Sequence, residues 1–197
     1  MRITGGEFCG RTLLVPKSDA IRPTQDRVRE ALFNILAPEI AGAEFLDLFA
    51  GSGAVGLEAL SRGAKAVTFV EQDRRHLAVL AQNVEACRVP PTAVTTVAAD
   101  CSRWLARYSG AGFTIGFADP PYALGREKGY AAVLATLAAR GVIREGGLFI
   151  AEMTAVQKAE DTPGWELLRD RTYGKTRLCI WRLLSQQPTQ QEGKVST

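Results

Sequence analysis

The sequence predicts an α/β fold, in which a mostly parallel sheet carries helices on both faces and ends in an antiparallel hairpin. From about residue 43, short apolar runs alternate with segments of helical periodicity, as in parallel strands joined by helices. After residue 152, two strand-like runs follow each other with only Gly174 and Lys175 between them, so we expect a hairpin. The chain of 197 residues is long enough to bury a substantial core.

The chain divides into three parts. Residues 1–22 contain Ile3 and an apolar run at 12–15 around a glycine-rich turn, which predicts a small N-terminal β-hairpin extension. A hairpin of this size needs a larger body to pack against. Residues 23–184 are expected to form the main domain. Residues 185–197 are rich in Gln, Pro, Ser and Thr, and we expect a disordered tail there.

The first helix is expected to begin near Thr24, as N-cap, and to end before Pro38. Its apolar positions have the spacing of one buried helix face: Val28, Ala31, Leu32, Ile35 and Leu36. The predicted strands are 45–49, 66–70, 94–98, 113–118, 148–151, 165–173 and 176–184. The predicted later helices lie near 53–62, 74–87, 101–108 and 127–140.

Composition narrows the possible functions. The formal charge of +3 permits a polyanionic partner without requiring one. The four cysteines have no metal-ligand spacing, and the single histidine, His76, is predicted to lie on the surface, so we expect no metal site. The sequence has no apolar leader and no run long enough to span a bilayer, which predicts a cytoplasmic protein.

A glycine-rich loop follows the first predicted strand of the sheet. Gly51, Gly53 and Gly56 satisfy the GxGxxG pattern, in which glycines let the backbone turn sharply and approach a ligand beside a helix N-terminus. This geometry suits both a dinucleotide and S-adenosylmethionine.

Two acids help to distinguish these ligands. Asp47 lies inside the strand before the loop, where its negative charge would favour the cationic methionine end of S-adenosylmethionine and would not favour a pyrophosphate. Glu71 ends the next strand, in a position to accept hydrogen bonds from a ribose diol. Because both ligands contain that diol, Glu71 supports either of them, and Asp47 favours S-adenosylmethionine.

The motif Asp119-Pro120-Pro121-Tyr122 directly follows the strand 113–118. In a parallel sheet this position lies at the same edge as the glycine loop, where such folds bind ligands. The nitrogen of an amino group on a nucleic-acid base is a poor nucleophile, because its lone pair is delocalised into the ring. The Asp119 carboxylate and the Pro120 carbonyl are placed to accept its two hydrogens, and Tyr122 offers a face for stacking. The motif therefore predicts methylation of such an amino group without a metal.

The chain resembles the RsmD family, bacterial S-adenosylmethionine-dependent methyltransferases that act on guanine N2 in 16S ribosomal RNA. The resemblance covers nearly all of residues 1–184 and implies a Rossmann-like class I methyltransferase fold with a seven-stranded sheet. It rests on Arg22-Pro23-Thr24-Gln25-Asp26-Arg27-Val28-Arg29-Glu30, Leu46-Asp47-Leu48-Phe49-Ala50-Gly51-Ser52-Gly53, Glu71 and Asp119-Pro120-Pro121-Tyr122. The first of these segments makes the match specific, because many amino-methyltransferases share the others.

The resemblance also implies roles for individual residues. Gly51, Ser52 and Gly53 would line the methionine part of the cofactor, Glu71 the ribose, and Asp100 with Cys101 the adenine. The further candidates for the cofactor site are Asp47, Phe49, Ala50, Gln72 and Thr24. The candidate catalytic residues are Asp119, Pro120, Pro121 and Tyr122.

Basic residues gather in the first 29 residues and in the last hairpin, both of which flank the expected active edge. The candidates for RNA contact are Arg2, Arg11, Lys17, Arg22, Arg27, Lys175 and Arg177. The expected partner is 16S rRNA within an assembled or assembling 30S subunit, and the expected oligomeric state is a monomer.

Other functions remain open on the sequence alone. The same site would suit methylation of adenine N6 in DNA or RNA, or of a protein glutamine. The glycine pattern also permits a nicotinamide-dependent oxidoreductase, but Asp47 and Asp119 would have no task in that enzyme. A non-catalytic RNA-binding protein of the same fold is a further alternative.

Overall fold

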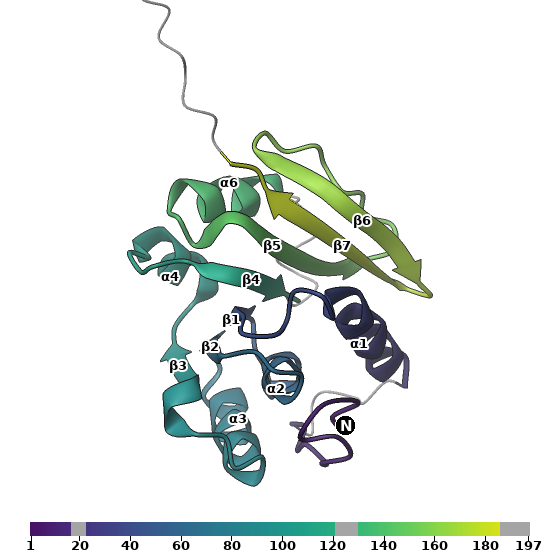
Figure 1. Cartoon of the computed structure of the whole chain (residues 1–197), viewed down its shortest axis with the longest axis vertical. Coiled ribbons are helices and arrows are strands. Elements are labelled where there is room, and N and C mark those ends of the chain that lie inside the picture. Colours follow the sequence, from purple (N-terminus) through teal and green to yellow (C-terminus); the bar gives the residue numbers. More distant parts are fainter. Residues whose placement is uncertain (17–22, 121–129, 186–197) are drawn as a thin grey trace, which may run out of the picture.

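Seven strands form one sheet in the order β3-β2-β1-β4-β5-β7-β6 (Figure 1). The computed structural model describes residues 1–16, 23–120 and 130–185. The strands are β1 (Glu44–Leu48), β2 (Ala66–Glu71), β3 (Val94–Ala98), β4 (Phe113–Ala118), β5 (Ile143–Thr154), β6 (Trp165–Tyr173) and β7 (Thr176–Leu183).

The first five strands are parallel, and the last two close the sheet as an antiparallel hairpin. In this register Asp47 of β1 pairs with Phe117 of β4, and Glu71 of β2 pairs with Ala98 of β3. The carboxyl ends of β1, β2 and β4 therefore meet at one edge. The predicted fold class, with its mostly parallel seven-stranded sheet and C-terminal hairpin, is confirmed.

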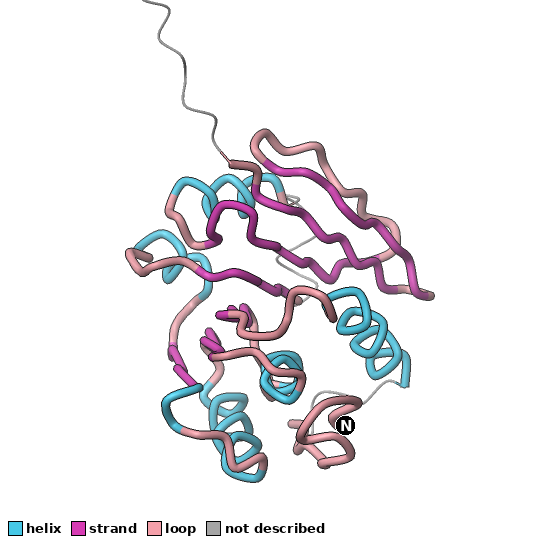
Figure 2. The backbone as a smooth tube through the Cα atoms, in the orientation of Figure 1, coloured by secondary structure: helices cyan, strands magenta, loops and turns pink. Residues whose placement is uncertain are grey.

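Helices cover both faces of this sheet (Figures 1 and 2). On one face lie α1 (Pro23–Leu36), α2 (Ala54–Ser61) and α3 (Arg74–Ala86); on the other lie α4 (Cys101–Arg107) and α6 (Ala131–Ala139). Each face has its own apolar core, because successive strand residues point to opposite sides. Phe45 and Phe117, for example, belong to the α1 face, whereas Leu46 and Ala118 belong to the other.

Several predicted boundaries differ from the structure. Helix α1 begins at Pro23, so Thr24 lies inside the helix and is not its N-cap; proline suits the first helical turn because its missing N–H would have no partner there. Strand β5 runs from Ile143 to Thr154, beyond the predicted 148–151, because pairing with β4 and β7 extends it past its apolar run. A short 3₁₀ helix, Pro91–Ala93, was not predicted. The predicted tail lies outside the described residues, apart from Ser185.

The N-terminal segment folds back on itself as predicted, but with one antiparallel bridge, Arg2 to Thr12, in place of two regular strands. It packs on α2, where Ser61 accepts a hydrogen bond from the Glu7 N–H through its carbonyl (2.7 Å) and one from the Phe8 N–H through its Oγ (2.8 Å). A Cβ on Gly6 would lie 1.8 Å from the Ser61 carbonyl oxygen, so this close approach requires glycine.

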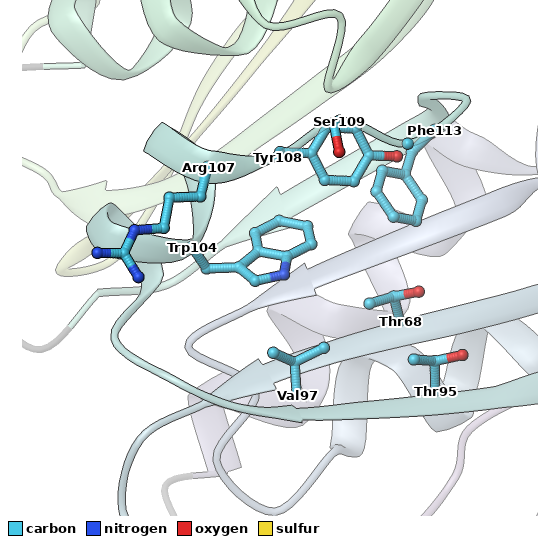
Figure 3. Close-up of a pocket in the computed structure, with 9 residues that line it drawn as sticks. Thr68, Thr95, Val97, Trp104, Arg107, Tyr108, Ser109 and Phe113 are labelled. Atoms are coloured by element: carbon cyan, nitrogen blue, oxygen red, sulfur yellow. The ribbon is translucent and has the colours of Figure 1, made fainter.

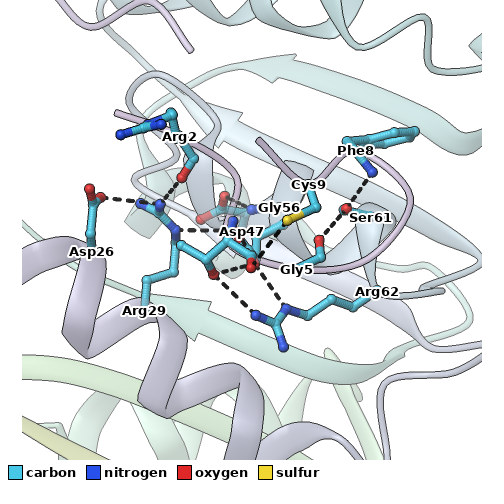
Figure 4. A network of polar contacts seen from close by, with 12 residues as sticks. Arg2, Gly5, Phe8, Cys9, Asp26, Arg29, Asp47, Gly56, Ser61 and Arg62 are labelled. Carbon is cyan, nitrogen blue, oxygen red and sulfur yellow. Dashed lines mark hydrogen bonds and ion pairs between the residues drawn. The ribbon is translucent and has the colours of Figure 1, made fainter. Parts of the chain in front are cut away.

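A buried carboxylate joins this segment to the helices (Figure 4). The side chain of Glu58 on α2 is inaccessible to solvent. It accepts hydrogen bonds from the Thr4 N–H (2.9 Å), from the Arg29 Nε–H of α1 (3.3 Å) and from the Arg62 Nε–H (2.9 Å). Arg29 also donates to the Arg2 carbonyl. This network fixes the segment and α1 against α2, and no sequence motif predicts it. None of the described helices combines the length and the apolar character needed to cross a membrane.

Candidate active site

The glycine loop between β1 and α2 has the backbone geometry that its sequence predicts. Gly51 and Gly53 have φ values of 55° and 79°, in the left-handed region that favours glycine. A Cβ on Gly53 would lie 2.2 Å from Leu80 Cδ1, whereas one on Gly51 would meet nothing nearer than 4.0 Å. The Gly51 backbone is therefore open to a ligand. Phe49 has φ 59°, and a non-glycine residue in this region stores backbone strain.

Gly56, the third glycine of the pattern, has a packing role. A Cβ there would lie 2.3 Å from Phe69 Cε1, so its absence lets α2 approach β2 closely. The Gly56 N–H donates a hydrogen bond to Asp47 Oδ2 at 2.9 Å.

Asp47 is buried beneath the loop, with 2% of its surface exposed. Burial raises the pKa of its carboxyl to about 7; the Gly56 hydrogen bond opposes this shift, and the charges of Asp119 and Glu71 add to it. Its Oδ2 is hydrogen-bonded to the Gly56 N–H of α2. We therefore expect Asp47 to act on a ligand at the loop through its charge and not through a direct hydrogen bond. A cationic ligand would stabilise the ionised form.

We expect Asp47→Asn to stabilise the unliganded protein at pH 8 relative to the wild type, and to stabilise it less at pH 5. The Asp47 pKa is about 7 in the folded chain and close to 4 when unfolded. Ionisation therefore opposes folding increasingly as the pH rises through this interval, by at most roughly 1.4 kcal/mol per pH unit. Urea unfolding of both proteins at pH 5, 6.5 and 8 measures the difference. A difference that is the same at all three pH values would contradict this account.

Glu71 at the end of β2 holds the glycine loop. Its Oε2 accepts a hydrogen bond from the Gly51 N–H (2.9 Å), and its Oε1 accepts from the N–H groups of Gln72 and Asp73 (both 2.8 Å). A carboxylate has about four acceptor positions, which leaves one for a ligand hydroxyl. His76 Nδ1 lies 3.7 Å from Oε2, and 23% of the His76 side chain is exposed, so His76 lies at the surface beside the Glu71 carboxylate.

Asp100 and Cys101 lie at the start of α4, as their position after the predicted strand 94–98 indicated. Asp100 caps the helix by accepting a hydrogen bond from the Arg103 N–H at 2.9 Å. The Cys101 thiol is buried and accepts a hydrogen bond from the Phe49 N–H at 3.3 Å, and burial raises its pKa to about 12. The Cys101 thiol thus helps to hold Phe49 in its strained backbone conformation. This contact was not predicted from the sequence.

The described part of the proline motif lies where the sequence placed it. Asp119 and Pro120 follow β4 at the same edge as Asp47, while Pro121 and Tyr122 lie outside the described residues. Asp119 is exposed by surface area, yet its pKa is raised to about 6 because the surrounding protein keeps part of the water away.

Glu152 on β5 also belongs to this edge and was not predicted. Its signal in the sequence is an acid between Ala151 and Met153 in an otherwise apolar run. Burial raises the pKa of its carboxyl to about 8; the charge of Asp119 adds to this shift, and the Thr176 hydroxyl opposes it. Glu152 and Asp119 are therefore close enough to influence each other's ionisation.

The predicted basic residues have different environments. Arg2, Arg27 and Lys175 are exposed. Arg11 is half-buried, donating to the Ala86 carbonyl (3.2 Å) with its guanidinium 5.1 Å from the Phe8 ring centroid. Arg177 forms a two-pronged ion pair with Asp170 (both contacts 2.6 Å) and donates to the Gln157 carbonyl, so its contacts are internal. Lys17 and Arg22 lie outside the described residues, as does the side chain of Thr24.

A cavity of about 460 Å³ lies on the α4 face of β2 and β3 (Figure 3). Trp104, Tyr108 and Phe113 form an aromatic cluster beside it, with Trp104 and Tyr108 ring centroids 5.0 Å apart. Thr95 and Phe113 stand near the amino ends of their strands. Its lining shares no residue with the glycine loop and does not include Asp47, Glu71 or Asp119.

The residues at the acidic edge fit S-adenosylmethionine better than a dinucleotide. The open Gly51 backbone permits close approach, and Glu71 retains an acceptor for a ribose hydroxyl. Asp47, Glu71 and Asp119 interact electrostatically and surround this position with acids. Such surroundings favour a sulfonium and an ammonium group, and disfavour a pyrophosphate.

The fold and this site define a class I methyltransferase that uses S-adenosylmethionine. The family model described as Conserved hypothetical protein 95 matches residues 1–182. Ribosomal RNA small subunit methyltransferase D of Escherichia coli is 37% identical over 183 residues, which cover 92% of this chain and 89% of that protein. The chain belongs to this family, the RsmD family that its motifs indicated.

Two solved structures agree with this assignment. The structure of the Escherichia coli protein yhhF has a TM-score of 0.83 and 34% identity, and the match covers 94% of this chain and 99% of that one. The Thermus thermophilus protein TTHA0928 has a TM-score of 0.74 and 35% identity, with 91% and 98% covered.

Proposed function

We propose that this protein transfers a methyl group from S-adenosylmethionine to the exocyclic N2 amino group of a guanine in 16S ribosomal RNA, within the small ribosomal subunit. The observation that carries the proposal is the position of Asp119 and Pro120, at the end of β4 beside Asp47 and the glycine loop. Its curated relative in Escherichia coli is named as a small-subunit ribosomal RNA methyltransferase, which supports the same substrate class. We expect the enzyme to act in the cytoplasm as a monomer.

In this proposal the chain positions two reactants. S-adenosylmethionine supplies an electrophilic methyl group on a sulfonium. Gly51 and Gly53 would hold its methionine part, and Glu71 its ribose. The Asp119 carboxylate and the Pro120 carbonyl would accept the two N2 hydrogens, so that the nitrogen lone pair points at the methyl group.

Asp119 is also placed to accept the proton that N2 releases on methylation. When N2 gains a methyl group it carries a positive charge, which it loses by releasing one hydrogen as a proton. With a pKa of about 6, Asp119 is mostly ionised at neutral pH and is placed to accept it.

Exposed basic residues on both sides of this edge would contact RNA phosphates. We expect Arg27→Ala and Lys175→Ala each to weaken binding of 16S rRNA and to reduce the slope of log K against log salt by about 1. Lys65 is exposed and lies at the opposite edge, at the start of β2, so Lys65→Ala is the matched control. Filter binding across a salt series measures the effect. Equal slopes for all four proteins would remove these residues from the RNA interface.

Radiolabelled methyl transfer tests the substrate. Small subunits from cells lacking the corresponding methyltransferase, protein-free 16S rRNA, double-stranded DNA and a glutamine-containing protein extract would be compared as acceptors. The proposal predicts incorporation into the 16S rRNA of the subunits, at a higher rate than into protein-free rRNA. Incorporation only into DNA or protein would contradict it.

A further inference from the structure

Asp119 and Glu152 lie side by side on one face of the sheet. Ala118, the last residue of β4, pairs with Ala151 of β5 in parallel register, and the strand alternation continued by one residue places Asp119, directly after β4, on the same side as Glu152. That side is the α1 face, because Phe117 and Ile150 belong to its core. In the sheet, β4 lies between β1 and β5. Glu152 is therefore on one side of Asp119, and β1 with the glycine loop is on the other, so Glu152 would border a base held by Asp119.

The backbone and side chain of Glu152 are both held in place. The Tyr130 hydroxyl donates to the Glu152 carbonyl oxygen at 3.2 Å, and the Thr176 Oγ1 lies 3.5 Å from Glu152 Oε1. Within residues 1–16, 23–120 and 130–185, no lysine or arginine makes a hydrogen bond or ion pair with Glu152 or Asp119. Two neighbouring acids favour a state in which one of them keeps its proton.

Of the two carboxyls, Glu152 is the one that keeps its proton near pH 7. The pKa values of the two carboxyls, about 8 for Glu152 and about 6 for Asp119, give a neutral Glu152 beside an ionised Asp119 near pH 7. The titratable groups that interact with Glu152 are Asp119, directly after β4, and Tyr130 before α6, whose pKa is itself raised by burial. A neutral carboxyl offers one O–H donor and one carbonyl acceptor, whereas an ionised one offers acceptors only.

We propose that Glu152 recognises the guanine base as a neutral carboxyl, accepting a hydrogen bond from N1–H and donating one to O6, while Asp119 holds the N2 amino group. This inference rests on the proposed function. On the Watson–Crick edge of guanine, O6, N1–H and the N2 amino group follow in sequence. The two neighbouring carboxyls thus match three neighbouring groups of the base. Ionised Glu152 would face O6 with an acceptor and repel it.

The test is the pH dependence of single-turnover methyl transfer to small subunits, for the wild type, Glu152→Gln and Glu152→Ala. The glutamine amide mimics the neutral carboxyl, since it has one acceptor and a donor. We expect Glu152→Ala to lower the rate at pH 7 about tenfold or more, and Glu152→Gln to restore most of that loss. The wild-type rate should decline with a midpoint near pH 8, whereas the Glu152→Gln rate should not.

Two outcomes would overturn the inference: a Glu152→Gln rate as low as that of Glu152→Ala, or the same alkaline decline in Glu152→Gln as in the wild type. Circular dichroism and S-adenosylmethionine affinity, measured on all three proteins, separate these outcomes from misfolding. The wild-type product identifies a failure of the proposed function, because methylation of a group other than guanine N2 would overturn that function together with this inference.

Discussion

Replacement of Asp119 by asparagine is expected to lower the rate of methyl transfer by a factor of about 10² to 10⁴, the range typical of a side chain that takes up a proton in the transition state. Asparagine keeps the size of the side chain and one oxygen acceptor. It loses the negative charge that stabilises the cationic nitrogen and the basicity that removes its proton. The rate is measured in a single turnover at saturating S-adenosylmethionine, so that the chemical step is observed.

Asp161 provides the matched control for this prediction. It is an exposed acid in the loop between β5 and β6, so Asp161→Asn should transfer methyl groups at the wild-type rate. Calorimetric titration with S-adenosylmethionine should give Asp119→Asn an affinity within about tenfold of the wild type, because cofactor contacts are assigned to the loop after β1. A rate within threefold of the wild type would remove Asp119 from the chemistry.

Replacement of Glu58 by alanine is expected to lower the free energy of unfolding by about 3–5 kcal/mol, the cost of removing one partner of a buried ion pair. Arg29 is 5% exposed, and without Glu58 its charge would remain buried with fewer partners. The Thr4 N–H and hydroxyl would lose their acceptor as well. Because these contacts join the N-terminal segment, α1 and α2, protease cleavage within the first 13 residues should also become faster.

Urea unfolding measures this loss, and a surface ion pair serves as the control. Lys65 and Glu44 lie 3.2 Å apart, but the Lys65 side chain is 69% exposed, so Lys65→Ala should cost less than about 1 kcal/mol. If Glu58→Ala costs no more than Lys65→Ala, the buried network does not hold the N-terminal segment in place.

The elements of the sheet could be predicted because their periodicity is local. The strands Val94–Ala98 and Phe113–Ala118 have the predicted boundaries, since each is an apolar run followed by a turn or a cap. The ends of β5 could not be predicted in this way. Its extra residues include Glu152 and Thr154, which pair as strand because β7 lies beside them.

The positions of the candidate site residues could be predicted where those residues belong to a recognisable motif. Gly51, Glu71 and Asp119 come together at one edge, as the parallel strands implied. Contacts between distant parts of the chain were not predictable. Glu152 reaches Asp119 only through the β4–β5 pairing, and Glu58 meets Arg29 only after α1 has packed against α2. Neither acid belongs to a motif, and each is recognised by its burial among partners far away in the sequence.

Mass analysis of the methylated nucleoside tests the central claim most directly. Small subunits lacking the modification would be incubated with the wild-type protein and S-adenosylmethionine, and the 16S rRNA digested to nucleosides. The account predicts N2-methylguanosine as the new product, formed about a hundredfold or more slowly when Asp119→Asn replaces the wild type. N6-methyladenosine, or a methyl group on a ring carbon or ribose, would contradict it, because the arrangement of Asp119 and Glu152 is matched here to the amino edge of guanine.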